Sequence, residues 1–319
     1  MIRLLKHDMI DKKRWDECIS KSFNGNIYAW SWYLDIVHPQ WDALIENNYE
    51  RVMPLTGKIK FGISYLFQPF FVQQLGVFSQ SVLSEDDVEN FISAIPEKYK
   101  VVKYRLNEYN KVRPEWNHIA MHRNVELDMI YDYQYLYNNY SKNTKRNLAK
   151  AEARGLSLNK NVKANDIIKL FRENRGKDVK HWNDEEYVRL LSLIDMAVCQ
   201  ECCFMTGVND IDGQLIAGAV FMVSHDRIIF LFSGNDDNYK DKHALTFLLD
   251  NTIREFSETQ YIFDFEGSDN EGLARFYKGF GGKEVFYPEI RLNNFKGIFK
   301  FACRIMGKGL WLKTKDKKL

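Results

Sequence analysis

Residues 263–282 read FDFEGSDNEGLARFYKGFGG and set a short apolar strand against a polar turn and a helix. Aromatic and β-branched residues alternate over residues 261–265, which predicts a strand. Gly267-Ser268-Asp269 supplies a break and the N-cap of a helix over residues 271–280. The segment therefore predicts a strand-to-helix junction, the usual place for a ligand in an open α/β sheet.

The junction collects groups that can support acyl transfer. Asp264 and Glu266 end the strand, and either could act as the base that deprotonates an amine. Tyr277 and Lys278 on the helix could protonate the leaving group or stabilise a developing negative charge. Arg275 could bind a carboxylate or a phosphate. The alternative is structural: the two carboxylates cap the next helix and Lys278 is solvated.

The segment resembles the FemAB-like branch of the GNAT acyltransferase superfamily, whose members carry an Asp-Phe-x-Gly-Ser-like strand end followed by Gly-Leu-x-x-Phe-Lys-x-x-Phe-Gly. In that family the lysine after the phenylalanine is assigned catalytic or substrate-orienting work. Here Tyr277 follows Phe276 and the lysine comes one place later, at Lys278, about 100° further round the helix. The resemblance implies transfer of an acyl or aminoacyl group onto an amine of a cell-envelope precursor or glycan.

The second half of the chain has a legible order of elements. Strands are expected at 156–158, 202–208, 215–223, 227–233, 261–265 and 284–292, and helices at 165–175, 184–200, 240–257 and 271–280. This order matches the GNAT fold.

The first half repeats the order more faintly. Strands are expected at 3–5, 42–46, 50–56, 64–71, 101–106, 118–121 and 125–130, and helices at 12–21, 29–37 and 85–95. The expected fold class is α/β (α+β), with two tandem GNAT-like domains, each a mixed central sheet flanked by helices. The expected domains are residues 1–138 and 139–292, followed by a basic amphipathic C-terminal helix and tail at 293–319.

A basic helix joins the two halves. Residues 140–155, YSKNTKRNLAKAEARG, predict a helix capped by Ser141 and ended by Gly155. Lys145 and Arg146 on this helix could hold the phosphates of a nucleotide-linked substrate, a coenzyme or tRNA. A solvated helix face is the alternative. Ser268 and Tyr239 complete the candidate substrate-binding residues of this half.

The acyl donor is left open between acyl-CoA and aminoacyl-tRNA, and no metal site is predicted. GNAT enzymes that use acetyl-CoA usually place a glycine-containing loop before the helix that begins here near Lys240, so that backbone N–H groups bind the pyrophosphate. Residues 237–244 read DNYKDKHA and contain no glycine, although Lys240, Lys242 and His243 could meet phosphates. FemAB-like enzymes, which take their acyl group from aminoacyl-tRNA, lack that loop as well.

Aromatic and amide side chains mark the first half. Trp32 and Gln73 could line an acceptor cleft between the domains, where ligand sites are common. An aromatic core is the simpler account of Trp32. Gln73 and Gln74 are too polar for that account, so at least one is expected to face out or to meet a ligand.

Composition limits the class of protein. With 319 residues, 45% of them hydrophobic, the chain can bury a sizeable core, and the length favours two domains. No run approaches the ~20 apolar residues of a membrane span, and the charged N-terminus does not resemble a signal peptide. A cytoplasmic location is expected, and the odd count of five cysteines favours a reducing compartment.

The charge is distributed unevenly. Residues 291–319 carry +8 and the rest of the chain −6. The spacing of apolar residues from 294 onward is helical, which predicts either peripheral contact with an anionic membrane at the inner face or a helix packed back onto the first domain. Three other functions remain open: an acyl-CoA-dependent N-acetyltransferase of a sugar or small amine, a catalytically silent binding protein, and a nucleic-acid binder.

Overall fold

The computed structural model describes residues 1–113, 115–116, 118–179 and 182–295, and the chain folds into two compact units. Unit 1 comprises Met1–Arg123 and Phe286–Leu319, and unit 2 comprises Asn124–Val285. The first boundary of these units lies before the expected 138/139, and Glu126–Asp128 already pair with a strand of unit 2. The second lies before 292/293, because the end of the last strand pairs with a strand of unit 1.

Unit 1 contains two sets of strands. In chain order its elements are β1 (Ile2–Leu5), η1 (His7–Met9), α1 (Lys12–Lys21), η2 (Ile27–Ala29), α2 (Ser31–Val37), β2 (Asp42–Glu46), β3 (Arg51–Leu55), β4 (Gly57–Lys60), β5 (Ile63–Leu66), β6 (Phe78–Ser79), α3 (Glu85–Ser93) and β7 (Tyr99–Arg105). The order β1-β2-β3-β6 forms one sheet, and β4-β5-β7-β14 continues from β7 to the last strand, β14 (Lys283–Asn293). β5 and β7 run parallel, whereas the pairs β1–β2, β2–β3, β3–β6, β4–β5 and β7–β14 are antiparallel.

Unit 2 is built on one sheet with the strand order β8-β13-β12-β11-β10-β9. Its elements are β8 (Ile119–Asp128), which enters from unit 1, α4 (Tyr133–Asn138), α5 (Lys142–Glu152), β9 (Ser157–Asn159), α6 (Ala164–Glu173), η3 (Arg175–Asp178), α7 (Asp184–Cys199), β10 (Cys203–Asn209), β11 (Leu215–Ser224), β12 (Arg227–Asn235), η4 (Asp237–Lys242), α8 (Ala244–Phe256), β13 (Ile262–Asp264) and α9 (Glu271–Lys278). β12 and β13 are parallel, whereas the pairs β8–β13, β11–β12, β10–β11 and β9–β10 are antiparallel. The helix between β12 and β13 makes this a crossover unit.

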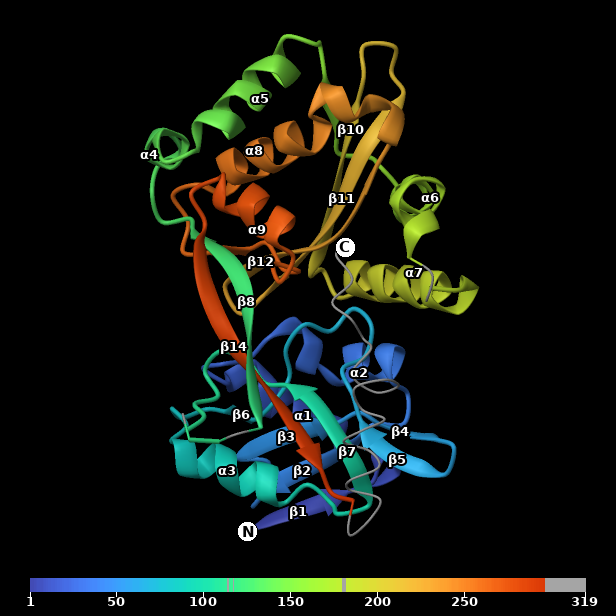
Figure 1. Ribbon diagram of the computed structural model, residues 1–319, viewed down its shortest axis with the longest axis vertical. Helices are drawn as coiled ribbons and strands as arrows, with labels where there is room; N and C mark the ends of the chain where they lie inside the picture. The colour runs from blue at the N-terminus through green and yellow to red at the C-terminus, as the bar shows by residue number, and fades with distance from the viewer. Residues whose placement is uncertain (114, 117, 180–181, 296–319) are drawn as a thin grey trace. The chain divides into compact units, whose positions relative to one another are not determined.

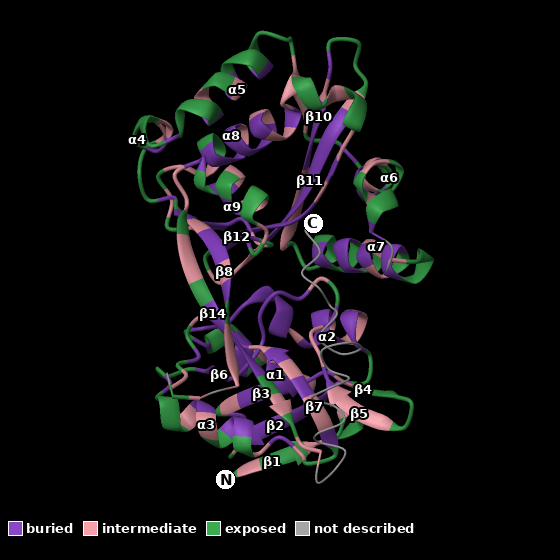
Figure 2. Ribbon diagram, viewed as in Figure 1, coloured by how far each residue is buried: buried purple, intermediate pink, exposed green. Residues whose placement is uncertain are grey.

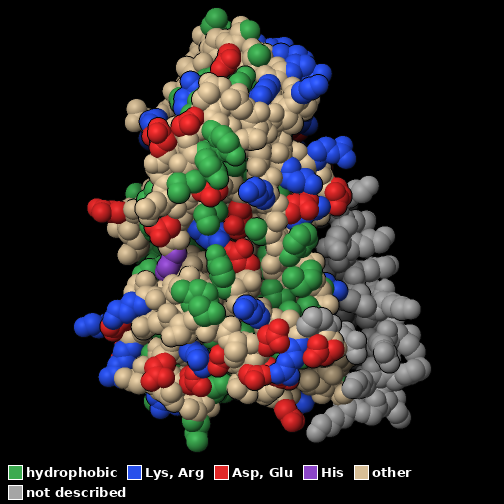
Figure 3. Space-filling view, turned by 90° about the vertical axis from the view of Figure 1, so that its left-hand side faces the viewer, with side chains coloured by type: hydrophobic (Ala, Val, Ile, Leu, Met, Phe, Trp, Pro, Cys, Tyr) green, Lys and Arg blue, Asp and Glu red, His purple; other side chains and the backbone are tan. Residues whose placement is uncertain are grey.

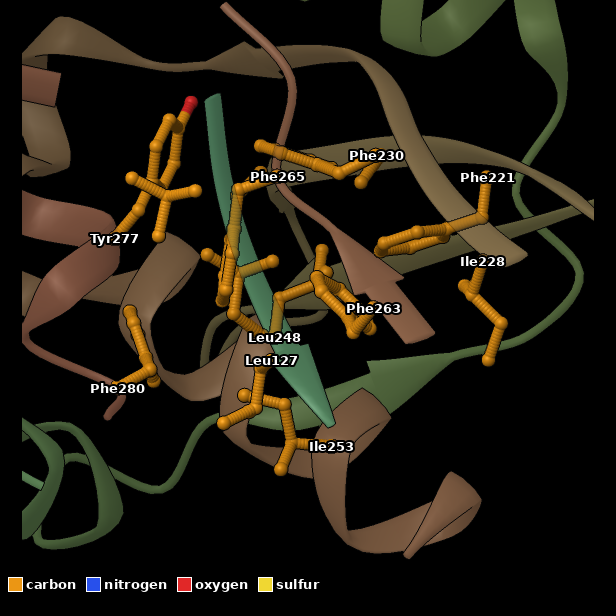
Figure 4. Packing of buried hydrophobic residues seen from close by; sticks show 14 of the residues in the cluster. Leu127, Phe221, Ile228, Phe230, Leu248, Ile253, Phe263, Phe265, Tyr277 and Phe280 are labelled. Carbon is orange, nitrogen blue, oxygen red and sulfur yellow. The ribbon is translucent and has the colours of Figure 1, made fainter. Parts of the chain in front are cut away.

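The core of unit 2 lies between the sheet and its helices. β11 and β12 are almost entirely buried (Figure 2), as expected for strands covered on both faces. Phe221 of β11, Phe263 of β13 and Leu248 of α8 are fully buried and pack in one cluster with Tyr277 and Phe280 (Figure 4). Burial of each such side chain contributes about 1.5–3 kcal/mol.

Two glycines let α6 approach the other face of the sheet. A Cβ atom at Gly218 of β11 would lie 2.7 Å from Ile167, and one at Gly234 of β12 would lie 2.5 Å from the Ile167 carbonyl oxygen. The absence of a side chain lets the Ile167 side chain contact the strand at Gly218 and lets the backbone of α6 contact the strand at Gly234. α6 is thereby fixed over the end of β12.

The predicted elements are largely confirmed. The helix expected at 12–21 and the strand at 42–46 agree residue for residue, and Ser141 caps α5 as expected. Two predictions are wrong. The strand expected at 64–71 ends at Leu66, because Pro69 cannot donate a ladder bond and Phe71 has a positive φ. The strands expected at 118–121 and 125–130 are one strand, β8, and the short helix α4 was not expected.

The C-terminal region is described only to residue 295. The predicted basic amphipathic helix from residue 294 lies almost entirely outside the described residues, so membrane contact stays a prediction. In the part of the chain that the structure describes, no helix is long and apolar enough to cross a membrane.

Candidate functional site

The parallel strands of unit 2 separate from one another. β12 and β13 are paired at Arg227↔Ile262 and Ile228↔Phe263, and the last pair is Ile229↔Asp264. β13 ends there, whereas β12 continues to Asn235. Among the strands that the structure describes, none pairs with this edge of β12 beyond Ile229. The backbone groups of Phe230–Gly234 on this edge are therefore placed to bind an extended ligand.

An irregularity in β12 coincides with the separation. Phe221 of β11 is opposite Phe230, while the next residue back, Val220, is opposite Phe232, so Leu231 is an extra residue in β12. Such a β-bulge bends the strand and re-aims its side chains, and bulges are frequent beside active sites. The bulge follows directly after the last paired residue, Ile229, so both features open the same part of the sheet.

Tyr277 lies beside this opening. Its ring stacks on Phe265 at a centroid distance of 5.0 Å and meets the Phe230 ring edge-on at 6.2 Å. Figure 4 shows its hydroxyl end turned away from the apolar cluster. Burial, and then the charge of Glu266, raise the pKa of the Tyr277 phenol above its usual value. Tyr277 is therefore a protonated donor at neutral pH, with the partly exposed Glu266 carboxylate nearby.

Asp264 is held in a buried charge network. Its Oδ1 accepts from Asn124 Nδ2 at 2.7 Å and from the backbone N–H of Glu266 at 2.9 Å. Its Oδ2 lies 3.5 Å from Arg227 Nη1, which also donates to Glu126 Oε1 at 2.5 Å. Asp264 and Arg227 are 3% and 9% exposed. The carboxylate expected as a base thus fixes the end of β13, and Glu266 is the better candidate.

The other predicted residues of α9 lie on its outer face. Lys278 is exposed and pairs with Glu284 at 2.7 Å, and Arg275 is exposed as well. The N-cap of α9 is Asn270, whose side chain accepts from the N–H groups of Gly272 and Leu273, so the cap expected at residues 267–269 is wrong. Ser268 is buried and donates to the Glu266 carbonyl oxygen at 2.9 Å, which gives it a role in the turn.

The N-terminus of α8 is a basic end of unit 2. α8 follows the carboxyl end of β12 through η4, and its N-cap residue, His243, has a left-handed backbone with φ +54° and no side-chain cap. Burial lowers the pKa of His243, and the charges of Lys150 and Arg154 on the neighbouring α5 lower it further. Arg154 is held by Asp241. Unsatisfied N–H groups, the helix dipole and two cations make this end suitable for phosphate.

The remaining residues predicted to bind substrate in unit 2 have other contacts. Lys145 Nζ donates to the Asn138 carbonyl oxygen at 3.0 Å, and Arg146 donates to Asn143 at 2.6 Å. The Tyr239 hydroxyl donates a hydrogen bond to Gln214 Oε1 at 3.1 Å, and Lys242 Nζ lies over the Tyr239 ring, 4.4 Å from its centroid. Figure 3 shows Lys and Arg side chains gathered near the top of the view, at the end of unit 2 where Figure 1 places α5. Besides burial, the charges of Lys150 and Arg154, and more weakly that of Arg146, lower the pKa of His243 at the start of α8.

Trp32 and Gln73 belong to unit 1. Trp32 is partly buried and packs against Tyr33 with a centroid distance of 5.4 Å. Gln73 and Gln74 are 5% and 6% exposed, and Gln74 donates to Gln73 Oε1 while accepting from the backbone of Glu108. Neither glutamine faces out, and each amide has a protein partner inside the unit, so that part of the expectation is wrong. Contact of Gln73 with a ligand stays a prediction.

Metal ligands are not clustered in the described part of the chain. Within residues 1–113, 115–116, 118–179 and 182–295, no three His, Cys, Asp or Glu side chains are arranged to hold a metal ion. Burial raises the pKa of Cys203 to about 12, so this cysteine is a neutral thiol.

The model of the acetyltransferase (GNAT) domain family matches residues 138–278, which span the separated strands, α8 and α9. Residues 138–278 form a GNAT domain. Unit 2 thus contains an acyltransferase domain. Among curated proteins, no relative of the chain is found.

Solved structures show the same fold over nearly the whole chain. FemX has a TM-score of 0.62 and 12% identity, covering 93% of this chain and 98% of FemX. A tandem GNAT protein from the clavulanic acid biosynthesis pathway has a TM-score of 0.52 and 11% identity, covering 93% and 100%. The C-terminal domain of a putative lysylphosphatidylglycerol synthetase from Agrobacterium fabrum has a TM-score of 0.51 and 11% identity, covering 93% and 94%. The expected fold, a tandem of GNAT-like domains, is confirmed.

Proposed function

We propose that the GNAT domain of unit 2 transfers an aminoacyl group from aminoacyl-tRNA to an amine of a cell-envelope precursor or glycan. The proposal rests on one observation in the crossover from β12 to β13. β12 separates from β13 after Ile229, and α8 begins after the carboxyl end of the same strand, β12. A carrier whose phosphate lies at the α8 N-terminus can therefore extend its acyl group along the free edge of β12.

The residues beside the opening support the two proton transfers of the reaction. The amine attacks the acyl carbonyl, a C–N bond forms, and the ester C–O bond to the carrier breaks. Glu266 takes the proton that the amine loses, and Tyr277 gives a proton to the leaving hydroxyl of the carrier. The raised pKa of Tyr277 suits this role, because the phenol is protonated when the bond breaks. N–H groups on the edge of β12 polarise the carbonyl.

The backbone before α8 favours a carrier other than coenzyme A. The left-handed position before the helix is occupied by His243, whereas a glycine there would let the pyrophosphate approach the backbone without a side chain. Lys150 and Arg154 are instead placed to hold a phosphodiester from the side of α5. Acyl-CoA remains the alternative donor, since its phosphates have the same chemistry.

A transfer assay tests the proposal. The protein is incubated with mixed aminoacyl-tRNAs and a UDP-linked muramyl peptide, and the acceptor is analysed by mass spectrometry. We expect a mass increase of one aminoacyl residue that depends on Tyr277. A parallel reaction with acetyl-CoA distinguishes the donors, because an acetyl mass increase with no aminoacyl product would make the protein a coenzyme-dependent N-acetyltransferase. No product from either donor, with intact folding, would contradict the proposal.

A further inference from the structure

Unit 1 contains a buried carboxylate surrounded by cations. Glu289 of β14 is 1% exposed. Its Oε1 accepts from Arg291 Nε at 2.6 Å. Its Oε2 lies 3.2 Å from His122 Nε2, 3.5 Å from Arg105 Nε and 4.0 Å from Lys103 Nζ. One negative charge is therefore shared among three permanent cations, and the local charge is positive.

The strand register places these cations on one face of the sheet. Glu289 is directly opposite Arg105, and Arg291 is directly opposite Lys103. Two like charges opposite one another on neighbouring strands repel. The side chains of Lys103, Arg105 and Arg291 are 41%, 30% and 44% exposed, so solvent reaches this face. An anion bound there would relieve the repulsion.

Glu289 also sets the direction of the two guanidinium groups. Both arginines contact the carboxylate through Nε, which leaves Nη N–H groups of each guanidinium for another acceptor. In the described residues, no hydrogen bond is formed by an Nη nitrogen of either arginine. Arg105 Nε is buried and has no well-aligned acceptor. The same holds for Nε2 of Gln68, a neighbouring side chain whose Oε1 accepts a hydrogen bond from the backbone N–H of Arg105. Donors are thus in excess at this place.

We propose that Arg105 and Arg291, oriented by Glu289, form an arginine clamp that binds a phosphate or diphosphate group. Two guanidinium groups held on one carboxylate offer several N–H donors on one face of the sheet, and guanidinium N–H groups suit the recognition of tetrahedral oxyanions. Glu289 is a positioning residue in this account. The clamp is built from residues of unit 1, whereas α8 belongs to unit 2. Resting on the proposed function, we assign to the clamp the diphosphate of a nucleotide-linked acceptor.

Binding of inorganic pyrophosphate, measured by isothermal titration calorimetry at low salt, tests the clamp. The measurement uses the full chain with Lys150→Gln and Arg154→Gln, so that the α8 end does not contribute. We expect saturable binding that Arg105→Gln or Arg291→Gln weakens at least tenfold. Arg105→Lys keeps the charge and is expected to weaken binding as well, because one ammonium cannot supply paired N–H groups.

Lys13→Gln is the matched control, since it removes one exposed positive charge of unit 1 from α1. It is expected to leave the affinity unchanged. Circular dichroism melting establishes that each variant is folded. The clamp is overturned if pyrophosphate does not bind, if both glutamine variants bind it as tightly as their parent, or if Arg105→Lys binds without loss. Failure of the clamp would not contradict phosphate binding at the N-terminus of α8, since aminoacyl transfer is measured in a separate experiment.

Discussion

At the scale of single residues, the site separates into side chains that fix the backbone and side chains placed for chemistry. Asp264 belongs to the first group, because its oxygens are occupied by Asn124, Arg227 and the Glu266 amide. We propose that Tyr277 and Glu266 belong to the second, because Tyr277 contacts Phe230 of β12 and the charge of Glu266 acts on the Tyr277 phenol. The sequence places all three at one junction without distinguishing these roles.

Tyr277→Phe is expected to lower the rate of transfer by about 100-fold, the lower limit for loss of a general acid. The ring contacts with Phe265 and Phe230 are retained, so stability should change little. Single-turnover kinetics would measure the effect, with Tyr261→Phe as control, since Tyr261 packs on Phe256 away from the opening. Because the pKa of Tyr277 is raised, its ionisation should not limit the rate below about pH 10, the ordinary value for a phenol. A fall in the transfer rate above about pH 8 that disappears in Tyr277→Phe would contradict this role.

Arg227→Met should destabilise unit 2 by about 3–5 kcal/mol, because it leaves the buried carboxylates of Asp264 and Glu126 without their cation. Urea denaturation would measure the loss. Arg172→Met provides the comparison, since the pair between Arg172 and Asp184 is largely exposed and contributes at most about 1 kcal/mol. Equal stabilities of the two variants would show that the network is not structural.

At the scale of elements, the sequence predicts the order of helices and strands well and the details of the site less well. The helix over residues 184–199 and the strands on either side of 210–214 follow from apolar runs and turn residues. The bulge at Leu231 does not, because it depends on the register between β11 and β12. The partner of Asp264 could not be predicted either, since Asn124 lies 140 residues away in the chain.

Gly234→Ala should destabilise unit 2 by about 1–3 kcal/mol, because the new Cβ would lie 2.5 Å from the Ile167 carbonyl oxygen and 2.8 Å from the Phe171 amide nitrogen. α6 would have to move from β12. Gly272→Ala is the matched control: its Cβ would meet only the Asn270 side chain at 3.1 Å, and alanine favours the helix by about 0.5–1 kcal/mol. Thermal melting should show a lower Tm for Gly234→Ala and a higher Tm for Gly272→Ala. An unchanged Tm for Gly234→Ala would mean that α6 is not packed against β12 as described.

At the scale of the whole molecule, unit 1 carries a charge network whose stability depends on pH. Burial alone would raise the pKa of Glu289, but His122, Lys103 and Arg291 together lower it to about 2. A lowered folded-state pKa stabilises the native state above the unfolded value of 4.5, and that contribution is lost as the pH falls towards 2. Its size is about 3 kcal/mol.

Glu289→Gln should therefore cost most stability near about pH 6 and progressively less as the pH falls from 4.5 to 2, as measured by urea denaturation across this range. Glu255→Gln is the control, because Glu255 forms an exposed pair with Lys160 and should change stability by less than about 1 kcal/mol throughout. A cost for Glu289→Gln that does not depend on pH would show that packing, rather than charge, holds Glu289 in place.

The basic end of α8 is proposed to hold the phosphate of the acyl donor. Equilibrium binding of donors to wild type and to Lys150→Gln/Arg154→Gln tests this role most directly. Lys160→Gln/Lys169→Gln is the control, since it removes the same charge from exposed pairs of unit 2. At fixed salt we predict that aminoacyl-tRNA binds the first variant at least tenfold more weakly than wild type and binds the control with less than a threefold change. Equal binding to all three proteins, or no binding to wild type, would contradict the account.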